Sequence, residues 1–128
     1  MRTNAGTDFQ SRVMFDTAST GTGTYAASNY IALTENTTAP AAADTALTGE
    51  LTASGLQRQQ GTYAHTGGTT TTTLTKTFTS ADATAHTIAK AGLLNASTAG
   101  TLAFSTALPN PPMLVTGDSL AVTWTFTF

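Results

Sequence analysis

The sequence predicts an all-β fold, a sandwich or jelly roll of about seven to nine short, mostly antiparallel strands. Thr, a β-branched residue that favours strands over helices, fills 31 of the 128 positions. Clusters of turn-forming residues recur at intervals of about ten positions, as in sandwiches and barrels. No stretch has the apolar periodicity of a helix of three turns.

The clearest predicted strand is residues 119–128. Its even positions are Leu, Val, Trp, Phe and Phe, and its odd positions are Ser, Ala and three Thr. This alternation of period two places all five large apolar side chains on one face. Burying each of them is worth about 1.5–3 kcal/mol before entropy is counted, so we expect this strand to be paired inside a sheet.

A β-hairpin is predicted around Gly67-Gly68, because paired glycines supply the positive φ angles of a tight turn. Residues 56–63 form its first arm. Residues 69–79 form the second arm, with eight Thr and with Leu74, Lys76 and Phe78 at period two.

The other predicted elements are shorter. Strands are expected at residues 12–15, 30–33, 47–52, 85–89, 92–94 and 102–108, and one helical turn at 44–47. Pro109, Pro111 and Pro112 end the strand that precedes them. We therefore expect a single β-sandwich domain over residues 16–128. Residues 1–15 are expected to form an exposed N-terminal arm that includes the first short strand.

Composition excludes several classes of protein and site. Only 12 residues are charged and the net charge is −2, which is incompatible with the basic face of a nucleic-acid-binding protein. Apolar runs reach four or five residues, far fewer than the roughly 20 that cross a membrane. Cysteine is absent, so disulfides and thiol chemistry are excluded. Polar residues follow Arg2 where a secretory signal needs an apolar core, so we expect no Sec export.

The sequence predicts no catalytic, cofactor or metal site. His65 and His86 are the only histidines and lack the spacing of a metal-ligand set. There is no Gly-x-Ser-x-Gly motif, and no close pair of carboxylates. We expect a non-enzymatic protein. Tyr25, Tyr30 and Tyr63 are expected at the edges of the core or at interfaces, since Tyr suits positions where one end of the side chain meets water. Arg2, Asp8 and Phe9 in the arm are predicted to contact a neighbouring protein, unless the arm is simply disordered.

Residues 25–34, 38–47, 89–96, 100–102 and 117–125 together resemble small structural proteins of tailed bacteriophages, and the similarity extends over residues 16–128. The resemblance implies a non-enzymatic virion protein, most similar to a capsid decoration (cement) protein that binds the major capsid protein and stabilises the capsid from outside. Related sequences are also described as tail or fibre proteins. The alternative is therefore a tail, fibre or baseplate module that binds a host receptor or neighbouring tail proteins.

We also expect a homotrimer. Uncharged surfaces suit the centres of oligomer interfaces, and closure around a threefold axis covers open sheet edges. The Thr run at residues 69–73 is predicted to be such an edge, because it has no Lys or Pro to block pairing. Decoration proteins of this size are often trimers, as the resemblance implies. The alternative is a monomer that meets its neighbours only on the capsid lattice.

Overall fold

The structure, a computed structural model, describes residues 3–18 and 26–128. They form one helix and nine strands: α1 (Asn4–Phe15), β1 (Tyr30–Thr34), β2 (Gln59–Gln60), β3 (Thr62–His65), β4 (Thr71–Thr79), β5 (His86–Thr87), β6 (Lys90–Leu94), β7 (Leu102–Ala107), β8 (Met113–Leu114) and β9 (Ser119–Thr127).

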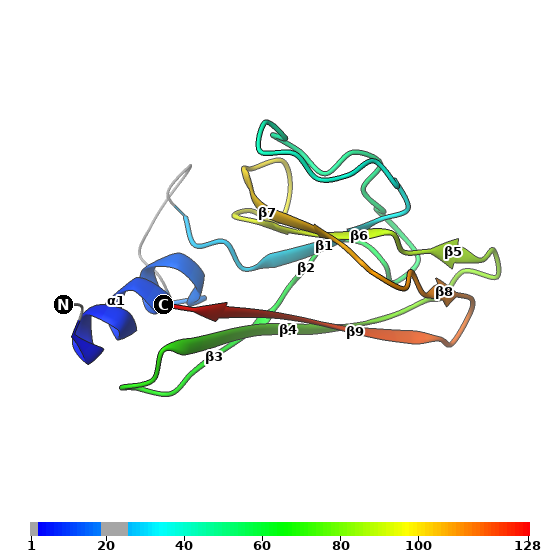
Figure 1. The fold of residues 1–128 in the computed structure, drawn as a ribbon. Coiled ribbons are helices and arrows are strands. Elements are labelled where there is room, and N and C mark those ends of the chain that lie inside the picture. The colour runs from blue at the N-terminus through cyan, green and yellow to red at the C-terminus, as the bar shows by residue number, and fades with distance from the viewer. Residues whose placement is uncertain (1–2, 19–25) are drawn as a thin grey trace.

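The strands form two main antiparallel sheets that face each other (Figure 1). One sheet has the order β2-β1-β6-β7 and the other β3-β4-β9, while β5 and β8 form a small separate pair. The core between the sheets includes Ile31 and Leu33 from one side and Leu74, Phe78 and Val122 from the other. The all-β sandwich-like prediction is confirmed, with one helix added.

The predicted hairpin is present, since β3 and β4 pair antiparallel with Tyr63 opposite Leu74. Gly68 in its turn has φ +81°, a conformation that favours glycine. β4 also pairs along its whole length with β9, so the Thr run lies mainly in a central strand. Its prediction as an open edge is therefore wrong, because both neighbours of residues 72–73 are occupied.

β9 confirms the alternation of residues 119–128. Val122 is buried, the other even-numbered side chains of the strand are half-buried, and the odd-numbered ones are exposed. On the outer face, Thr75 and Thr123 of adjacent strands lie with their hydroxyl oxygens 3.2 Å apart. The outer face of this sheet is thus a surface of hydroxyl and methyl groups.

Some predicted elements between β1 and β3 are wrong. Residues 56–63 do not form one strand, because the chain crosses between the two sheets at Gly61, separating β2 from β3. Gly61 donates its N–H to Asn29 O at 2.7 Å, and a Cβ there would lie 3.2 Å from Ile31 Cδ1. Residues 47–52 contribute only an isolated bridge between Glu50 and Thr34. The helical turn expected at 44–47 is replaced by an earlier turn, in which Asp44 N–H bonds Ala41 O.

The N-terminal segment is also different from its prediction. Residues 12–15 belong to α1 and are not a strand, and α1 has 12 residues where no helix of three turns was expected. Thr3 caps the helix by accepting the N–H of Gly6 on its Oγ1 at 3.2 Å. Over residues 3–15, a helix with one buried face replaces the exposed arm.

Candidate interaction surface on the N-terminal helix

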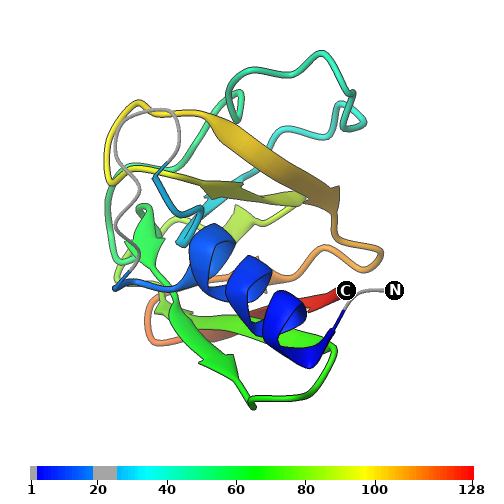
Figure 2. The same ribbon diagram turned by 90° about the vertical axis from the view of Figure 1, so that its left-hand side faces the viewer.

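α1 lies across one end of the sandwich, beside the β3–β4 hairpin (Figure 2). Its buried side chains are Thr7, Ser11 and Phe15, which are four residues apart and therefore share one helix face. Phe15 is fully buried and its ring is stacked on that of Phe126, with ring centroids 4.2 Å apart. An aromatic contact thus joins the helix to the C-terminal strand β9.

Polar bonds attach the same face of the helix to the hairpin. Ser11 Oγ is 2.8 Å from the Tyr63 hydroxyl and also bonds the Thr72 hydroxyl. Ser11 and Thr72 are fully buried, so this network satisfies hydroxyl groups that would otherwise destabilise the fold. The helix is therefore held by specific hydrogen bonds as well as by apolar packing.

A histidine–carboxylate contact lies at the rim of this network. His65 Nε2 is 2.8 Å from Asp8 Oδ1, and the Gly68 N–H donates to the same oxygen at 3.0 Å. His65 Nδ1 is 3.0 Å from the carbonyl oxygen of Thr71, so acceptors face both ring nitrogens. This arrangement favours imidazolium, the form that donates from both nitrogens.

The two groups shift each other's protonation equilibria. The hydrogen bond to Asp8 raises the pKa of His65 above its ordinary value of 6.5, although burial of the ring opposes the shift. The hydrogen bond from His65, followed by that from Gly68, lowers the pKa of Asp8 below 3.8. Between pH 3.8 and pH 6.5, Asp8 is therefore ionised and His65 protonated, and the contact is an ion pair.

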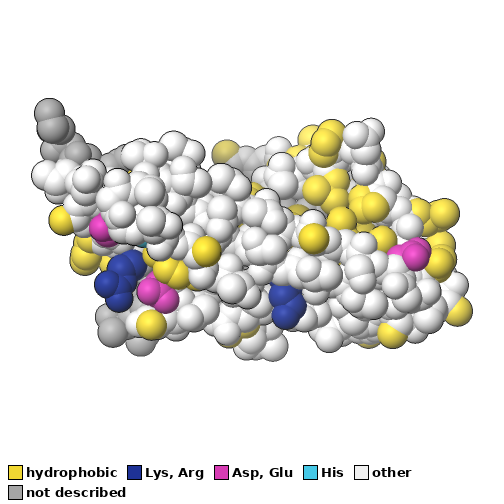
Figure 3. Space-filling model, turned by 90° about the horizontal axis from the view of Figure 1, so that it is seen from below, with side chains coloured by type: hydrophobic (Ala, Val, Ile, Leu, Met, Phe, Trp, Pro, Cys, Tyr) yellow, Lys and Arg dark blue, Asp and Glu magenta, His cyan; other side chains and the backbone are white. Residues whose placement is uncertain are grey.

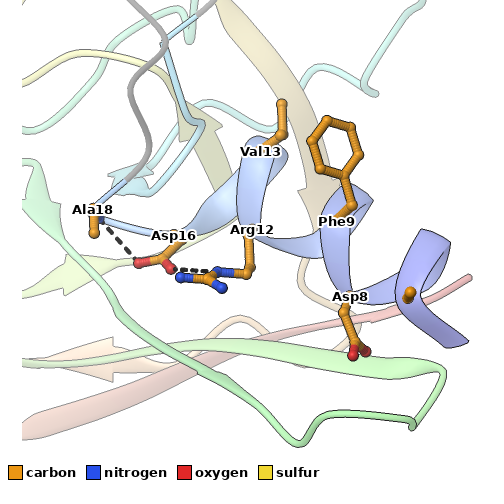
Figure 4. Close-up of a pocket in the computed structure, with 7 residues that line it drawn as sticks. Asp8, Phe9, Arg12, Val13, Asp16 and Ala18 are labelled. Carbon is orange, nitrogen blue, oxygen red and sulfur yellow. Dashed lines mark hydrogen bonds and ion pairs between the residues drawn. The ribbon is translucent and has the colours of Figure 1, made fainter.

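The opposite face of α1 is apolar and exposed. Phe9 is 68% exposed, and Val13, one turn later on the same face, is 45% exposed. A hollow of about 420 Å³ is lined by Ala5, Asp8, Phe9, Arg12, Val13, Asp16 and Ala18. In Figure 4, Phe9 and Val13 point away from the hairpin, while Asp8 points toward it. This face can contact another protein without breaking the bonds that hold the helix.

The structure separates the six predicted contact and interface residues. Phe9 is exposed, whereas the carboxylate of Asp8 bonds the chain's own hairpin. Tyr63 is half-buried and bonds Ser11, and Tyr30 is half-buried in β1, opposite Gln60 and Leu94. Arg2 and Tyr25 lie outside the described residues.

The helix face was missed because two of its three buried residues are polar. Thr3 as a cap, followed by Thr7, Ser11 and Phe15 at fixed spacing, was the signal available in the sequence. A search for apolar residues alone does not detect such a face.

His86 forms a second histidine–carboxylate cluster, at the β5–β8 end of the molecule. Its Nδ1 is 3.2 Å from Glu35 Oε2 and its Nε2 is 3.1 Å from Asp82 Oδ2. The hydrogen bond to Asp82, then that to Glu35, raises the pKa of His86 above 6.5. The pKa of Asp82 is lowered first by the N–H of Thr84 and then by His86. The cluster links the loop after β1 to the turn after β4 through β5.

Two cations, the half-buried Arg58 and the buried Lys90, hold loops together. Arg58 donates from Nε and Nη2 to the two oxygens of Glu50, at 2.7 and 2.6 Å. Its Nη1 donates to the carbonyl oxygens of Ala96 and Ala99. Lys90, only 5% exposed, donates from Nζ to Thr38 O at 2.8 Å. Both cations form their hydrogen bonds within this chain, so we assign them a structural role.

Within the described residues, no group of three or more His, Asp or Glu side chains is arranged to hold a metal ion. The same part of the chain contains no helix with the length and hydropathy needed to cross a membrane.

The model of a family described as "Podophage GP4 fiber I protein gp80" matches residues 7–125. The chain belongs to this family. It is a phage structural protein, and the resemblance to tailed-phage virion proteins is confirmed at that level. No curated protein and no solved structure matches the chain.

The family name describes a fibre protein, so it agrees with the alternative prediction better than with capsid decoration. The matched region begins inside α1 and ends in β9. It includes the exposed face of α1 from Phe9 onward, the edge strands β2, β3 and β7, and the edge strand β9 up to Thr125.

Proposed function

We propose that this chain is a non-enzymatic structural module of a phage tail fibre, which assembles with further copies of itself and with neighbouring tail proteins. The family match over residues 7–125 supports this proposal most directly. The description of that family as a fibre protein makes the tail a better location than the capsid surface.

The surface chemistry also supports an assembly role. Figure 3 shows a face with few charged side chains, most of it formed by uncharged polar groups and backbone. Covering uncharged polar groups costs less free energy than covering charged ones, and the centres of oligomer interfaces are depleted in charge. A homotrimer of such modules, with α1 facing a neighbouring tail protein, is the assembly that we propose.

Immunogold labelling of intact virions tests the location. An antibody against the folded chain should label the tail fibres, and particles should contain few copies relative to the major capsid protein. Label spread over the capsid, with many copies per particle, would support capsid decoration and overturn the fibre proposal.

The exposed face of α1 can be tested without unfolding the helix. Phe9→Ser removes the most exposed large apolar side chain, and we expect it to reduce incorporation of the chain into virions. Thr77→Ser, on the exposed face of β4, is the matched control and should be incorporated normally. Equal incorporation of both folded variants would exclude this face from the contact. Deletion of residues 1–10 is a poorer test, because it also removes Asp8 and most of α1.

A further inference from the structure

The two main sheets end on the same side of the sandwich. β7 is the last strand of one sheet and β9 the last strand of the other. Figures 1 and 2 both place these strands on one side of the molecule, which we call the open side. β7 and β9 run in opposite directions along it (Figure 1).

The register shows which backbone groups of β9 face outward. Phe128 N–H bonds Thr70 O, and Ser80 N–H bonds Asp118 O, so even-numbered residues in this register point their backbone groups toward β4. The odd-numbered residues therefore direct their N–H and C=O away from the sheet. Within the described part of the chain, these outward groups of β9 form no backbone hydrogen bond. In β7, Leu108 N–H bonds Ala89 O, so Ser105, three residues earlier, directs its backbone N–H and C=O away from β6.

Neither edge contains the charged residues or prolines that normally block strand addition, over the nine residues of β9 and the six of β7. β7 has a bulge at Ala103, so its regular edge is residues 104–107. Half-buried aromatic rings lie between the two strands: Phe104 of β7 is 5.1 Å from Phe126 and 6.4 Å from Trp124 of β9, measured between ring centroids. The open side thus combines unpaired backbone with an incompletely covered aromatic row.

We propose that the open side is the contact between copies of this chain, with β9 of one copy paired edge to edge with β7 of the next. The inference rests on the proposed homotrimer and specifies its interface. Rotation about an axis along the strands brings these two edges together as an antiparallel pair, because they already run in opposite directions within one copy.

The alternation of small and large side chains along β7 and β9 favours a second copy of this chain as the partner that covers the open side. In β9, and in β7 beyond its bulge at Ala103, the residues with outward backbone groups carry small side chains, such as Thr123 and Ser105. The intervening large side chains, such as Trp124 and Phe104, face the core. Pairing β9 with β7 therefore extends the outer hydroxyl face and places the aromatic rows of two copies side by side.

Thr123→Pro tests the edge directly. Proline at this position removes an outward N–H that bonds nothing in β4, and edge strands tolerate proline there. Thr123→Ala is the matched control, because both variants lose the Thr75 hydroxyl contact but only proline loses the N–H. By light scattering at micromolar concentration, we expect wild type and Thr123→Ala to have three times the chain mass of 13.1 kDa, and Thr123→Pro to be a folded monomer by circular dichroism.

Ser105→Pro and its control Ser105→Ala repeat the test on β7. If Thr123→Pro does not fold, this second pair of variants tests whether the open side is the contact between copies. A mixture of the two folded proline variants should form dimers, because each retains one intact edge. A monomeric wild type, or folded proline variants that remain trimeric, overturn the inference. Association of Ser105→Pro but not Thr123→Pro indicates β9–β9 pairing and also overturns it. These measurements use the isolated chain, whereas the fibre proposal fails only if virion labelling is found elsewhere.

Discussion

Replacing Phe15 with Ala tests whether α1 is an integral part of the fold. Phe15 is fully buried and contacts the core where it stacks on Phe126. Phe-to-Ala substitutions in cores lower the free energy of unfolding by about 3–5 kcal/mol, through lost burial and the cavity left behind. With a urea m-value of about 2 kcal/mol/M, this loss lowers the unfolding midpoint by about 1.5–2.5 M. Equilibrium urea denaturation followed by tryptophan fluorescence measures the shift.

Phe9→Ala is the matched control, since it removes the same side chain from the same helix. Phe9 is 68% exposed, so we expect a change of less than about 0.5 kcal/mol. If the two variants unfold at the same urea concentration, the helix does not contribute to the cooperative core and the packing argument is refuted. An unchanged m-value in both variants is needed for the comparison, because a changed m-value reports a change in the surface exposed.

Four further substitutions test other parts of the fold. The pKa of His86 is raised in the folded state, so its protonation stabilises the fold below pH 6.5, and this stability is lost as pH rises through the raised pKa. We therefore expect the melting temperature of His86→Gln to fall less than that of wild type as pH rises above 6.5. Equal slopes of melting temperature against pH for the two proteins would contradict this. Gly117→Ala should lower the free energy of unfolding by about 1–2 kcal/mol through backbone strain alone, since φ is +88° and the space is open. Gly55→Ala should be clearly worse in the same urea assay, because its Cβ would lie 2.1 Å from Thr79 O. Arg58→Lys keeps the charge but loses the bidentate hydrogen bond to Glu50, and we expect the free energy of unfolding to fall by about 1–3 kcal/mol. A denaturation curve identical to that of wild type would show that the bidentate geometry does not contribute to stability.

Local patterns in the sequence predict the strands that carry strong signals. The alternation in residues 119–128 gives the buried face of β9, and Gly67-Gly68 gives the hairpin, because both depend on neighbouring residues. The pairing of β4 with β9 joins residues about 50 positions apart, so no local pattern shows that the Thr run is central. Side-chain alternation is the same in a central strand and an edge strand.

The candidate site was predicted only in part, for related physical reasons. Phe9 was predicted to contact a neighbouring protein from an exposed arm, and the structure shows its side chain exposed on α1. Asp8 was predicted to contact another protein, but it bonds His65, which lies 57 positions away in the sequence. A carboxylate that meets a distant histidine cannot be recognised from spacing, and neither can the buried bond between Ser11 and Thr72.

The two cations that hold the loops together, Arg58 and Lys90, also affect how the folded chain withstands digestion. Trypsin cleaves after Lys and Arg, but Arg58 is half-buried in an ion pair, Lys90 is buried, and Lys76 lies half-buried in the central strand β4. Among the described residues this leaves Arg12, whose side chain is 70% exposed but whose backbone is helical. A virion is released into surroundings that contain enzymes from lysed cells. Scarce basic residues, most of them engaged in the fold, leave the sandwich almost without accessible sites for a protease of this specificity.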